Sequence, residues 1–256
     1  MLELSIANRV ATLTLCRPPV NALSEEWGEA FERELDDLMQ RDDWNVLHLR
    51  SAQKVFAAGA DLAQIHSWTK LPSPGARLAT YIGHLQRAFA RLESLPCVTL
   101  AEIGGAALGG GLELALSCDL RMAALEAKLG LPEVGLGLIP SLGGTQRLTR
   151  LVGAGVANRM ILGAETLSGD VALQLGLVQW AVPRESLADA AAALAARIAA
   201  LPRPALGVAK ELIAAAAAPQ NRLGFSLERE AGGRLLDTPE AQERIFAFLQ
   251  KTPSQK

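Results

Sequence analysis

The spacing of apolar residues in the N-terminal part of the chain predicts two strands, a helix and a third strand. Apolar and polar residues alternate in Leu2–Ala7 and Val10–Leu15, on either side of a polar pair, which predicts a β-hairpin. After Ser24, which is a typical helix N-cap residue, the apolar spacing becomes that of a helix. The residues on the apolar face of this helix are Trp27, Phe31, Leu35 and Leu38. Val46–Arg50 then predicts a strand.

The middle of the chain predicts a helix, a strand, a glycine-rich turn, a short helix and another strand. Ser67–Ala76 is polar and contains proline, which indicates a loop, and Arg77–Leu95 has helical spacing. The elements that follow are a strand at Val98–Ile103, a helix at Leu112–Leu116 and a strand at Asp119–Ala123. This order predicts an α/β fold whose sheets are covered by helices.

Beyond Leu142 the spacing is almost wholly helical. Ser168 predicts a helix N-cap, and Gly176 predicts the end of that helix. Further helices are predicted at Leu187–Ala200, Pro204–Ala217, Arg222–Leu236 and Pro239–Lys251. The sequence has no fixed-period repeat, so a solenoid is not expected.

The composition narrows the classes of protein that fit this pattern. The chain has 256 residues, half of them hydrophobic, which is enough for a large core. Its net charge is −2 and it has no basic cluster, which argues against a nucleic-acid partner. Cys16, Cys97 and Cys118 are far apart and fit no zinc spacing, so we expect buried free thiols and no metal. No signal peptide or membrane span is recognisable, and we expect a soluble cytoplasmic protein.

The segment Ile103–Glu113 carries the first chemical signal. It holds five glycines between Gly104 and Gly111 and runs directly into a helix, whose first N–H groups have no intrahelical partner. The lysine of a phosphate-binding loop is missing, and Glu113 would repel phosphate. Close packing of a strand on a helix would also use these glycines, but it gives no reason to bury a glutamate. The segment therefore favours stabilisation of a carbonyl oxygen that becomes negative during a reaction.

Two further segments contain side chains that fit the same site. Phe56–Leu62 places small residues after a strand, and its Asp61 is able to cap a helix. Leu131–Arg147 places a second glutamate, Glu133, between a proline and a glycine-rich run. Two glutamates in apolar surroundings are suited to acid–base work on a water molecule.

Together these segments resemble the crotonase superfamily, also called the enoyl-CoA hydratase/isomerase family. The matching motifs are F-A-A-G-A-D-L at Phe56–Leu62, A-L-G-G-G-L-E-L-A at Ala107–Ala115, L-P-E-V-G-L-G-L-I-P at Leu131–Pro140 and G-G-T-Q-R-L at Gly143–Leu148. The opening run L-T-L-C-R-P-P-V-N-A-L-S is also similar to the family's first substrate-contacting segment. The resemblance extends over essentially the whole chain.

The resemblance implies a fold, an assembly and a substrate class. The fold would be a crotonase-like spiral of ββα units over residues 1–196, forming two nearly perpendicular sheets. A helical C-terminal region at residues 197–256 would make trimers, which in many relatives pair into hexamers. The substrate would be an acyl-CoA thioester, as in fatty acid metabolism, with no separate cofactor.

The resemblance also implies the residues of the site. Glu113 and Glu133 would be catalytic, and the backbone N–H groups of Ala60 and Gly110 would form an oxyanion hole. The residues that would contact the substrate are Ala58, Asp61, Leu62, Gly109, Pro132 and Ser141. Hydratases of the family carry both glutamates, so hydration of a 2-enoyl-CoA is favoured. The alternatives are a Δ3-Δ2 enoyl-CoA isomerase or another crotonase-type lyase and, in a different class, a non-catalytic or RNA-associated member.

Two positions depart from the family pattern. Ser141 stands where glycine is common, beside the expected water site, and Ala63 stands where some relatives carry a lysine near the CoA nucleotide. We therefore expect other basic groups to bind the CoA phosphates. The candidates are Lys54, Arg17 and Lys251.

Several other side chains fit structural roles better than chemical ones. His48 lies within an apolar strand and is expected to be packed or hydrogen-bonded, and Asp119 is expected to cap or pair. Trp68 and Tyr81 are expected either to pack in the core or to contact an acyl chain, and His66 is a candidate for lining an acyl pocket.

Overall fold

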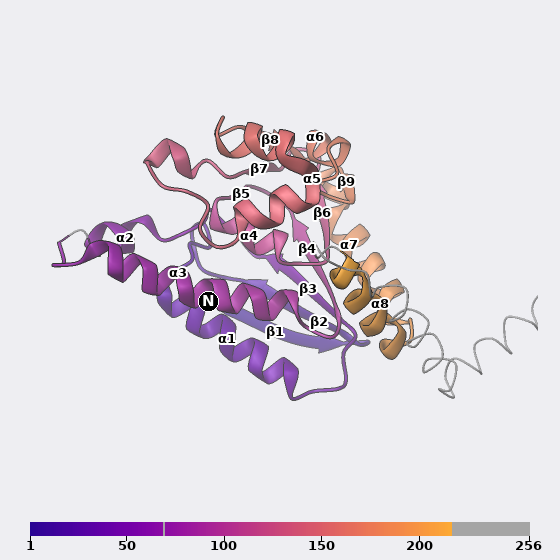
Figure 1. Ribbon diagram of the computed structural model, residues 1–256. Coiled ribbons are helices and arrows are strands. Elements are labelled where there is room, and N and C mark those ends of the chain that lie inside the picture. The colour runs from indigo at the N-terminus through magenta and orange to yellow at the C-terminus, as the bar shows by residue number, and fades with distance from the viewer. Residues whose placement is uncertain (69, 217–256) are drawn as a thin grey trace, which may run out of the picture.

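The computed structural model describes residues 1–68 and 70–216, and Figure 1 shows their arrangement. The helices predicted at Arg222–Leu236 and Pro239–Lys251 lie outside the described residues. The domain boundary at residue 196 stays a prediction, and it falls within a helix that continues to Ala199.

The larger sheet, within the described residues, has six strands in the order β1-β2-β3-β4-β6-β9. They are β1 (Leu2–Ala7), β2 (Val10–Leu15), β3 (Val46–Ser51), β4 (Val98–Ile103), β6 (Leu120–Ala124) and β9 (Trp180–Val182). β1 and β2 form the predicted antiparallel hairpin, and the other neighbours pair in parallel. Strands β3 and β6 are buried almost throughout, as expected of parallel strands with both faces covered.

A second, smaller sheet was implied by the family resemblance, but the hydrophobic pattern predicted none of its strands. In the described part of the chain it consists of β5 (Ala107–Leu108), β7 (Lys128–Gly130) and β8 (Thr166–Ser168), in that order. β5 pairs with β7 in parallel, and β7 pairs with β8 antiparallel. Strands of two or three residues are too short to show alternation in a sequence. The prediction of an almost wholly helical chain beyond Leu142 is therefore wrong at β8 and β9.

Two long helices, α1 (Glu25–Met39) and α3 (Pro74–Glu93), lie side by side in front of the larger sheet in Figure 1. The Ser24 hydroxyl accepts from the Trp27 N–H at 3.2 Å, which confirms the predicted N-cap of α1. The four residues of the predicted apolar face are fully buried. The Phe31 ring meets the Phe89 ring edge-on at 6.5 Å between centroids and joins α1 to α3.

The loop predicted at Ser67–Ala76 is shorter than expected. Its first two residues end α2 (Leu62–Trp68), and its last three begin α3 at Pro74. Proline was one reason to predict a loop here, whereas Pro74 is well suited to the first turn of a helix because its missing N–H has no intrahelical role there. Helix α3 ends at Glu93, two residues before the predicted end.

The remaining helical elements are α4 (Gly110–Leu116), the 3₁₀ helix η1 (Glu133–Leu136), α5 (Gly144–Ile161), α6 (Gly169–Gln174), α7 (Arg184–Ala199) and α8 (Arg203–Ala216). Ser168 and Gly176 flank α6 as predicted, with Gly176 at φ 76°. Helix α7 packs across β2, β3, β4, β6 and β9. Among the described residues no single helix is long and apolar enough to cross a membrane, and the one pair that would qualify together, α7 and α8, is bent by 104°.

The close approach of α4 to the backbone of Ala57 gives a test of the fold. A Cβ on Gly111 would lie 2.1 Å from the carbonyl oxygen of Ala57, and a Cβ on Gly75 would meet no atom within 4 Å. We expect Gly111→Ala to lower the free energy of unfolding by about 1–3 kcal/mol, because backbone has to move. Gly75→Ala, a matched control inside α3, should raise it by up to about 1 kcal/mol. Urea unfolding at equal protein concentrations measures both, and equal stability of the two variants would contradict the packing described.

Candidate active site

The glycine-rich turn enters α4 through Gly109, as the sequence predicts, and it follows β5, which the sequence did not predict. Gly109 has φ 52° and ψ −127°, and its N–H donates to the Gly130 carbonyl at 2.9 Å. Gly111 approaches Ala57 too closely for a side chain at that position. Glycines therefore let the turn lie against the Phe56–Leu62 segment, which is far away in the sequence.

The loop that carries Ala60 lies against the first residue of α4. A Cβ on Gly110 would lie 3.5 Å from the Ala60 amide nitrogen. Leu23 holds the loop, because its N–H donates to the Gly59 carbonyl at 2.8 Å and its carbonyl accepts from the Asp61 N–H at 3.0 Å. Among the described residues, the N–H groups of Ala60 and Gly110 have no acceptor. Two neighbouring backbone donors are therefore available to an oxygen from outside the chain.

Glu113 lies on the first turn of α4 with only 1% of its surface exposed. Its Oε1 accepts from the backbone N–H groups of Leu142 and Gly144, both at 2.7 Å. Burial, aided by the charge of Glu133, raises the pKa of Glu113 to about 7, although the two N–H donors and Arg147 act to lower it. A carboxyl group with this pKa exchanges protons readily at neutral pH.

Glu133 begins η1 with its carboxylate beside the glycine turn. A Cβ on Gly109 would lie 2.9 Å from Oε1 of Glu133. Its Oε2 is buried and has no hydrogen-bond partner among the described residues. Burial raises the pKa of this carboxyl group above its usual range. Because a buried polar atom normally has a partner, Oε2 is suited to hold a proton or to bind a water molecule.

Asp61 and Arg17 tie the Ala60 loop to the segment that follows β2. The Asp61 Oδ1 accepts from the Gln64 N–H at 3.1 Å, which confirms its capping of α2. Its Oδ2 pairs with Arg17 at 2.7 Å, and Arg17 also donates to the Ala22 carbonyl at 2.6 Å. The Arg17 guanidinium is thus held by the protein itself. Of the other phosphate-binding candidates, Lys54 is exposed, and Lys251 lies outside the described residues.

The other predicted contact residues surround this centre. Ala58 and Leu62 are exposed, and Pro132 immediately precedes η1. Ser141 donates its hydroxyl to the Ile139 carbonyl at 2.8 Å, so that hydroxyl is engaged within its own loop. The Ser141 carbonyl accepts from Gln86 at 2.6 Å.

The residues that hold Glu113 were not predicted from the sequence. The two amide donors belong to Leu142 and Gly144, and the Arg147 guanidinium donates to the Leu142 carbonyl at 2.9 Å. The motif G-G-T-Q-R-L contained all three groups or their neighbours. Its glycines signal a sharp turn, but the sequence does not show what that turn contacts.

The side chains that were expected to pack, pair or cap do so in the structure. His48 pairs with Glu102 at 2.8 Å inside the sheet, and Asp119 accepts from Thr99 and pairs with Lys210 at 2.8 Å. Trp68 and Tyr81 are buried against each other with ring centroids 5.4 Å apart, which favours packing over contact with an acyl chain. The three cysteines are free, and Cys97 and Cys118 are buried as predicted, whereas Cys16 is half-buried.

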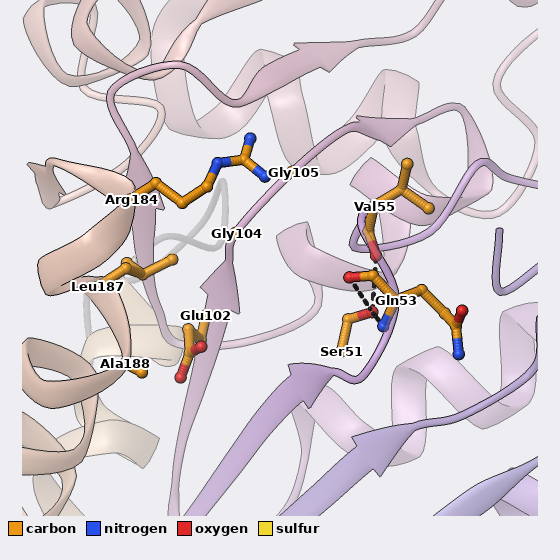
Figure 2. Close-up of a pocket in the computed structure, with 9 residues that line it drawn as sticks. All are labelled: Ser51, Gln53, Val55, Glu102, Gly104, Gly105, Arg184, Leu187 and Ala188. Atoms are coloured by element: carbon orange, nitrogen blue, oxygen red, sulfur yellow. Dashed lines mark hydrogen bonds between the residues drawn. The ribbon is translucent and has the colours of Figure 1, made fainter. Parts of the chain in front are cut away.

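A pocket of about 210 Å³ at the ends of β3 and β4 is separate from these residues (Figure 2). Figure 2 shows Arg184 extending toward Gly105, with Glu102 on the near strand and Gln53 on the opposite wall. None of the predicted site residues lines it. The described residues also contain no group of three or more His, Cys, Asp or Glu side chains placed to hold a metal ion.

An α/β fold that brings two free amides beside the buried carboxylate of Glu113 and the half-buried carboxylate of Glu133 defines a class of protein suited to polarise a carbonyl group and to move protons next to it. A family model described as Enoyl-CoA hydratase/isomerase matches residues 5–255. The chain belongs to the enoyl-CoA hydratase/isomerase family, which confirms the resemblance inferred from its motifs.

Individual relatives agree with this assignment over nearly the whole chain. A protein of Bacillus subtilis strain 168 named probable enoyl-CoA hydratase is 38% identical over 255 residues, covering 99% of this chain and 97% of that protein. Pseudomonas aeruginosa DspI has a TM-score of 0.91 at 35% identity, covering 98% of this chain and 94% of that chain. The enoyl-CoA hydratase of Bacillus anthracis has a TM-score of 0.91 at 32% identity, covering 98% and 96%. The predicted crotonase-like fold is confirmed.

The raised pKa of Glu113 predicts a pH dependence of stability. A carboxyl group that titrates near 7 when folded and near 4.5 in its unperturbed state binds more protons in the folded protein, so its contribution to stability falls as pH rises from about 4.5 to 7. Glu113→Gln keeps an acceptor for both N–H groups and removes this titration. The free energy of unfolding of the variant, relative to that of the unchanged protein, should therefore rise by on the order of 2–3 kcal/mol from pH 5 to pH 8.

Urea unfolding at both pH values measures this gain. A Glu133→Gln background is the matched control, because removing the neighbouring charge should shrink the gain. A difference between Glu113→Gln and the unchanged protein that does not vary with pH would contradict the raised pKa.

Proposed function

We propose that this protein is an enoyl-CoA hydratase, which adds water across the 2,3 double bond of a 2-enoyl-CoA thioester. The observation that carries the proposal is the pair of carboxylates at the glycine turn, of which Glu113 is buried and Glu133 is half-buried. Glu113 is anchored through one oxygen, and Glu133 has a buried oxygen without a partner among the described residues. Addition of water needs a group that takes a proton and a group that supplies one, so two carboxylates with different surroundings fit this reaction.

Glu113 is proposed as the base. The two backbone N–H groups bound to Oε1 favour its charged form and leave Oε2 for a water molecule. As the oxygen of that water forms a bond to the β-carbon, Glu113 takes a proton from it. The electron pair of the double bond then moves toward the thioester carbonyl, which becomes an enolate oxygen.

Ala60 and Gly110 are proposed to stabilise that enolate oxygen through their backbone N–H groups, which have no acceptor among the described residues. Glu133 is proposed as the acid, because its partnerless oxygen and its raised pKa favour the protonated form. It delivers its proton to the α-carbon, and the electron pair returns from the enolate to form that bond. Proton exchange with solvent then restores both carboxyl groups, and the net addition is one water molecule.

Several wider properties are proposed with this activity. The substrate is an acyl-CoA thioester held near Ala58, Asp61, Leu62, Gly109, Pro132 and Ser141, and coenzyme A is part of the substrate rather than a cofactor. The family resemblance supports a homotrimer or a hexamer of two trimers, a cytoplasmic location and a role in fatty acid metabolism. No nucleic-acid or membrane partner is proposed.

The acid–base assignment predicts the behaviour of two variants. Glu113→Gln and Glu133→Gln should each lower kcat for hydration by roughly 100- to 10,000-fold, because each removes one proton transfer. Both should still bind a saturated acyl-CoA, which needs no proton transfer. The measurements are loss of the conjugated-thioester absorbance over a chain-length series of enoyl-CoA substrates, and calorimetric binding of the saturated analogue. Near-normal turnover by either variant would overturn the assignment.

Product analysis separates hydration from the alternatives. In ¹⁸O-labelled water a hydratase places the label on the β-carbon, whereas a Δ3-Δ2 isomerase moves the double bond without taking up label. An absence of reaction with every enoyl-CoA in the series would defeat the proposal. Salt-dependent RNA binding without turnover would instead favour the non-catalytic class.

A further inference from the structure

The turn at residues 141–144 is the part of the chain that fixes the Glu113 carboxylate. The donors to Oε1 are two residues apart, at Leu142 and Gly144, and both are at 2.7 Å. Gly143 between them has φ 106°, which favours glycine and turns the chain so that both N–H groups reach the same oxygen. The orientation of the carboxylate therefore depends on the shape of this turn.

Arg147, one helical turn into α5, holds the turn from its other side. Its Nη1 donates to the Leu142 carbonyl at 2.9 Å. Leu142 is thus bound to Glu113 through its N–H and to Arg147 through its carbonyl. A Cβ on Gly143 would lie 2.0 Å from the same Nη1, which means that the guanidinium occupies the space of that missing side chain. The Arg147 side chain is only 12% exposed.

Helix α3 fixes Arg147 and the turn at two points. The Nε and Nη2 atoms of Arg147 donate to Oε2 of Glu93 at 3.0 and 2.8 Å. Gln86, seven residues earlier on the same helix, donates to the Ser141 carbonyl at 2.6 Å. Side chains thus hold the carbonyls of Ser141 and Leu142, while the N–H groups of Leu142 and Gly144 hold Glu113.

We propose that Arg147 is a positioning residue that holds the turn at residues 141–144 so that Glu113 meets the reacting water in a productive orientation. This inference rests on the proposed hydratase function. Among the described residues no hydrogen bond or ion pair joins Arg147 to Glu113, so Arg147 acts through the Leu142 peptide. A displacement of about 1 Å at a reacting group is enough to lower a rate by about 100-fold, so this indirect hold is sufficient to matter.

Arg147 also acts on Glu113 through its charge. The groups that face Glu113 are Glu133 of η1, Arg147 of α5 and the buried Tyr81 of α3. Burial and the Glu133 charge raise the pKa of Glu113, and the positive charge of Arg147 opposes them. Loss of that charge should therefore move the rising limb of the kcat/KM–pH profile, which reports ionisation of the base, to higher pH.

A pocket of about 210 Å³ gives access to the guanidinium. Gln86, Glu93 and Leu142 line it together with Arg147 and Arg150. Arg150 is a suitable control, because it lines the same pocket and no ion pair or hydrogen bond of its side chain is present among the described residues.

The experiment compares Arg147→Met, Arg147→Lys and Arg150→Met in the full chain. Arg147→Met should lower kcat for enoyl-CoA hydration by about 10- to 100-fold with KM nearly unchanged, and should move the rising limb to higher pH. Guanidinium ions, which fit the vacated space, should restore part of kcat, whereas the same concentration of sodium chloride should not. Arg147→Lys keeps the charge and should keep the limb in place with an intermediate kcat. Arg150→Met should match the unchanged protein.

Two results would overturn the inference. One is a normal kcat in folded Arg147→Met. The other is a variant whose kcat, KM and thermal stability all worsen, with no movement of the limb and no rescue by guanidinium, because that pattern describes a merely structural residue. If Arg147→Met does not fold, Arg147→Lys and Glu93→Gln test the positioning role in its place. A normal kcat in both of these variants would reject that role.

Backbone amide hydrogen exchange provides a readout that does not depend on hydration. Without substrate, the amides of Leu142 and Gly144 should exchange faster in Arg147→Met than in Arg150→Met. Faster exchange in a protein that hydrates no enoyl-CoA would support the role of Arg147 in holding the turn and would reject the proposed hydratase function. Unchanged exchange in an active enzyme would reject the hold and keep the function.

Discussion

A buried carboxyl group held by two backbone N–H groups is the interaction on which the site depends. Burying a glutamate without partners is costly, and Leu142 and Gly144 offset that cost at one oxygen only. The other oxygen is left without this support, and the pKa of Glu113 remains raised to about 7. The fold thus neither keeps Glu113 protonated at all pH values near 7 nor fully stabilises its charged form. This balance requires the turn at residues 141–144 to keep both N–H groups in place.

Long elements were predictable from the sequence because each carries its own repeated pattern. The hairpin and β4 have the predicted bounds, and α1 buries the four residues that its spacing marked. Errors came where a pattern was short or had two meanings. Strands β5, β7, β8 and β9 are too short to alternate visibly, and Pro74 reads equally as a break and as a first helical residue. These elements exist because of pairing and packing with distant parts of the chain.

The same division applies to the site. Glu113 and the glycines of its turn stand in one short segment, so the sequence places them together. Glu133 and Ala60 come from separate segments, and the family resemblance, rather than spacing, joined them. Arg147 was missed because it contacts a carbonyl oxygen, and a sequence carries no sign of which carbonyl a side chain will reach. The hydrogen bond of Gln86 depends on how α3 lies against the turn at residues 141–144, and that of Arg147 on how α5 follows this turn.

The small sheet has a consequence for the length of the chain. Pairing of Leu108 with Gly130 sets the start of two segments, one leading to Gly110 two residues later and the other to Glu133 three residues later. An extended residue spans about 3.3 Å, more than a hydrogen bond tolerates as an error. A single insertion in either segment would therefore move the Gly110 N–H away from the Glu133 carboxyl group. The connection between α2 and α3 does not set this spacing. Redesign of this protein has freedom in what side chains it presents around the turn, and almost none in how many residues connect the small sheet to it.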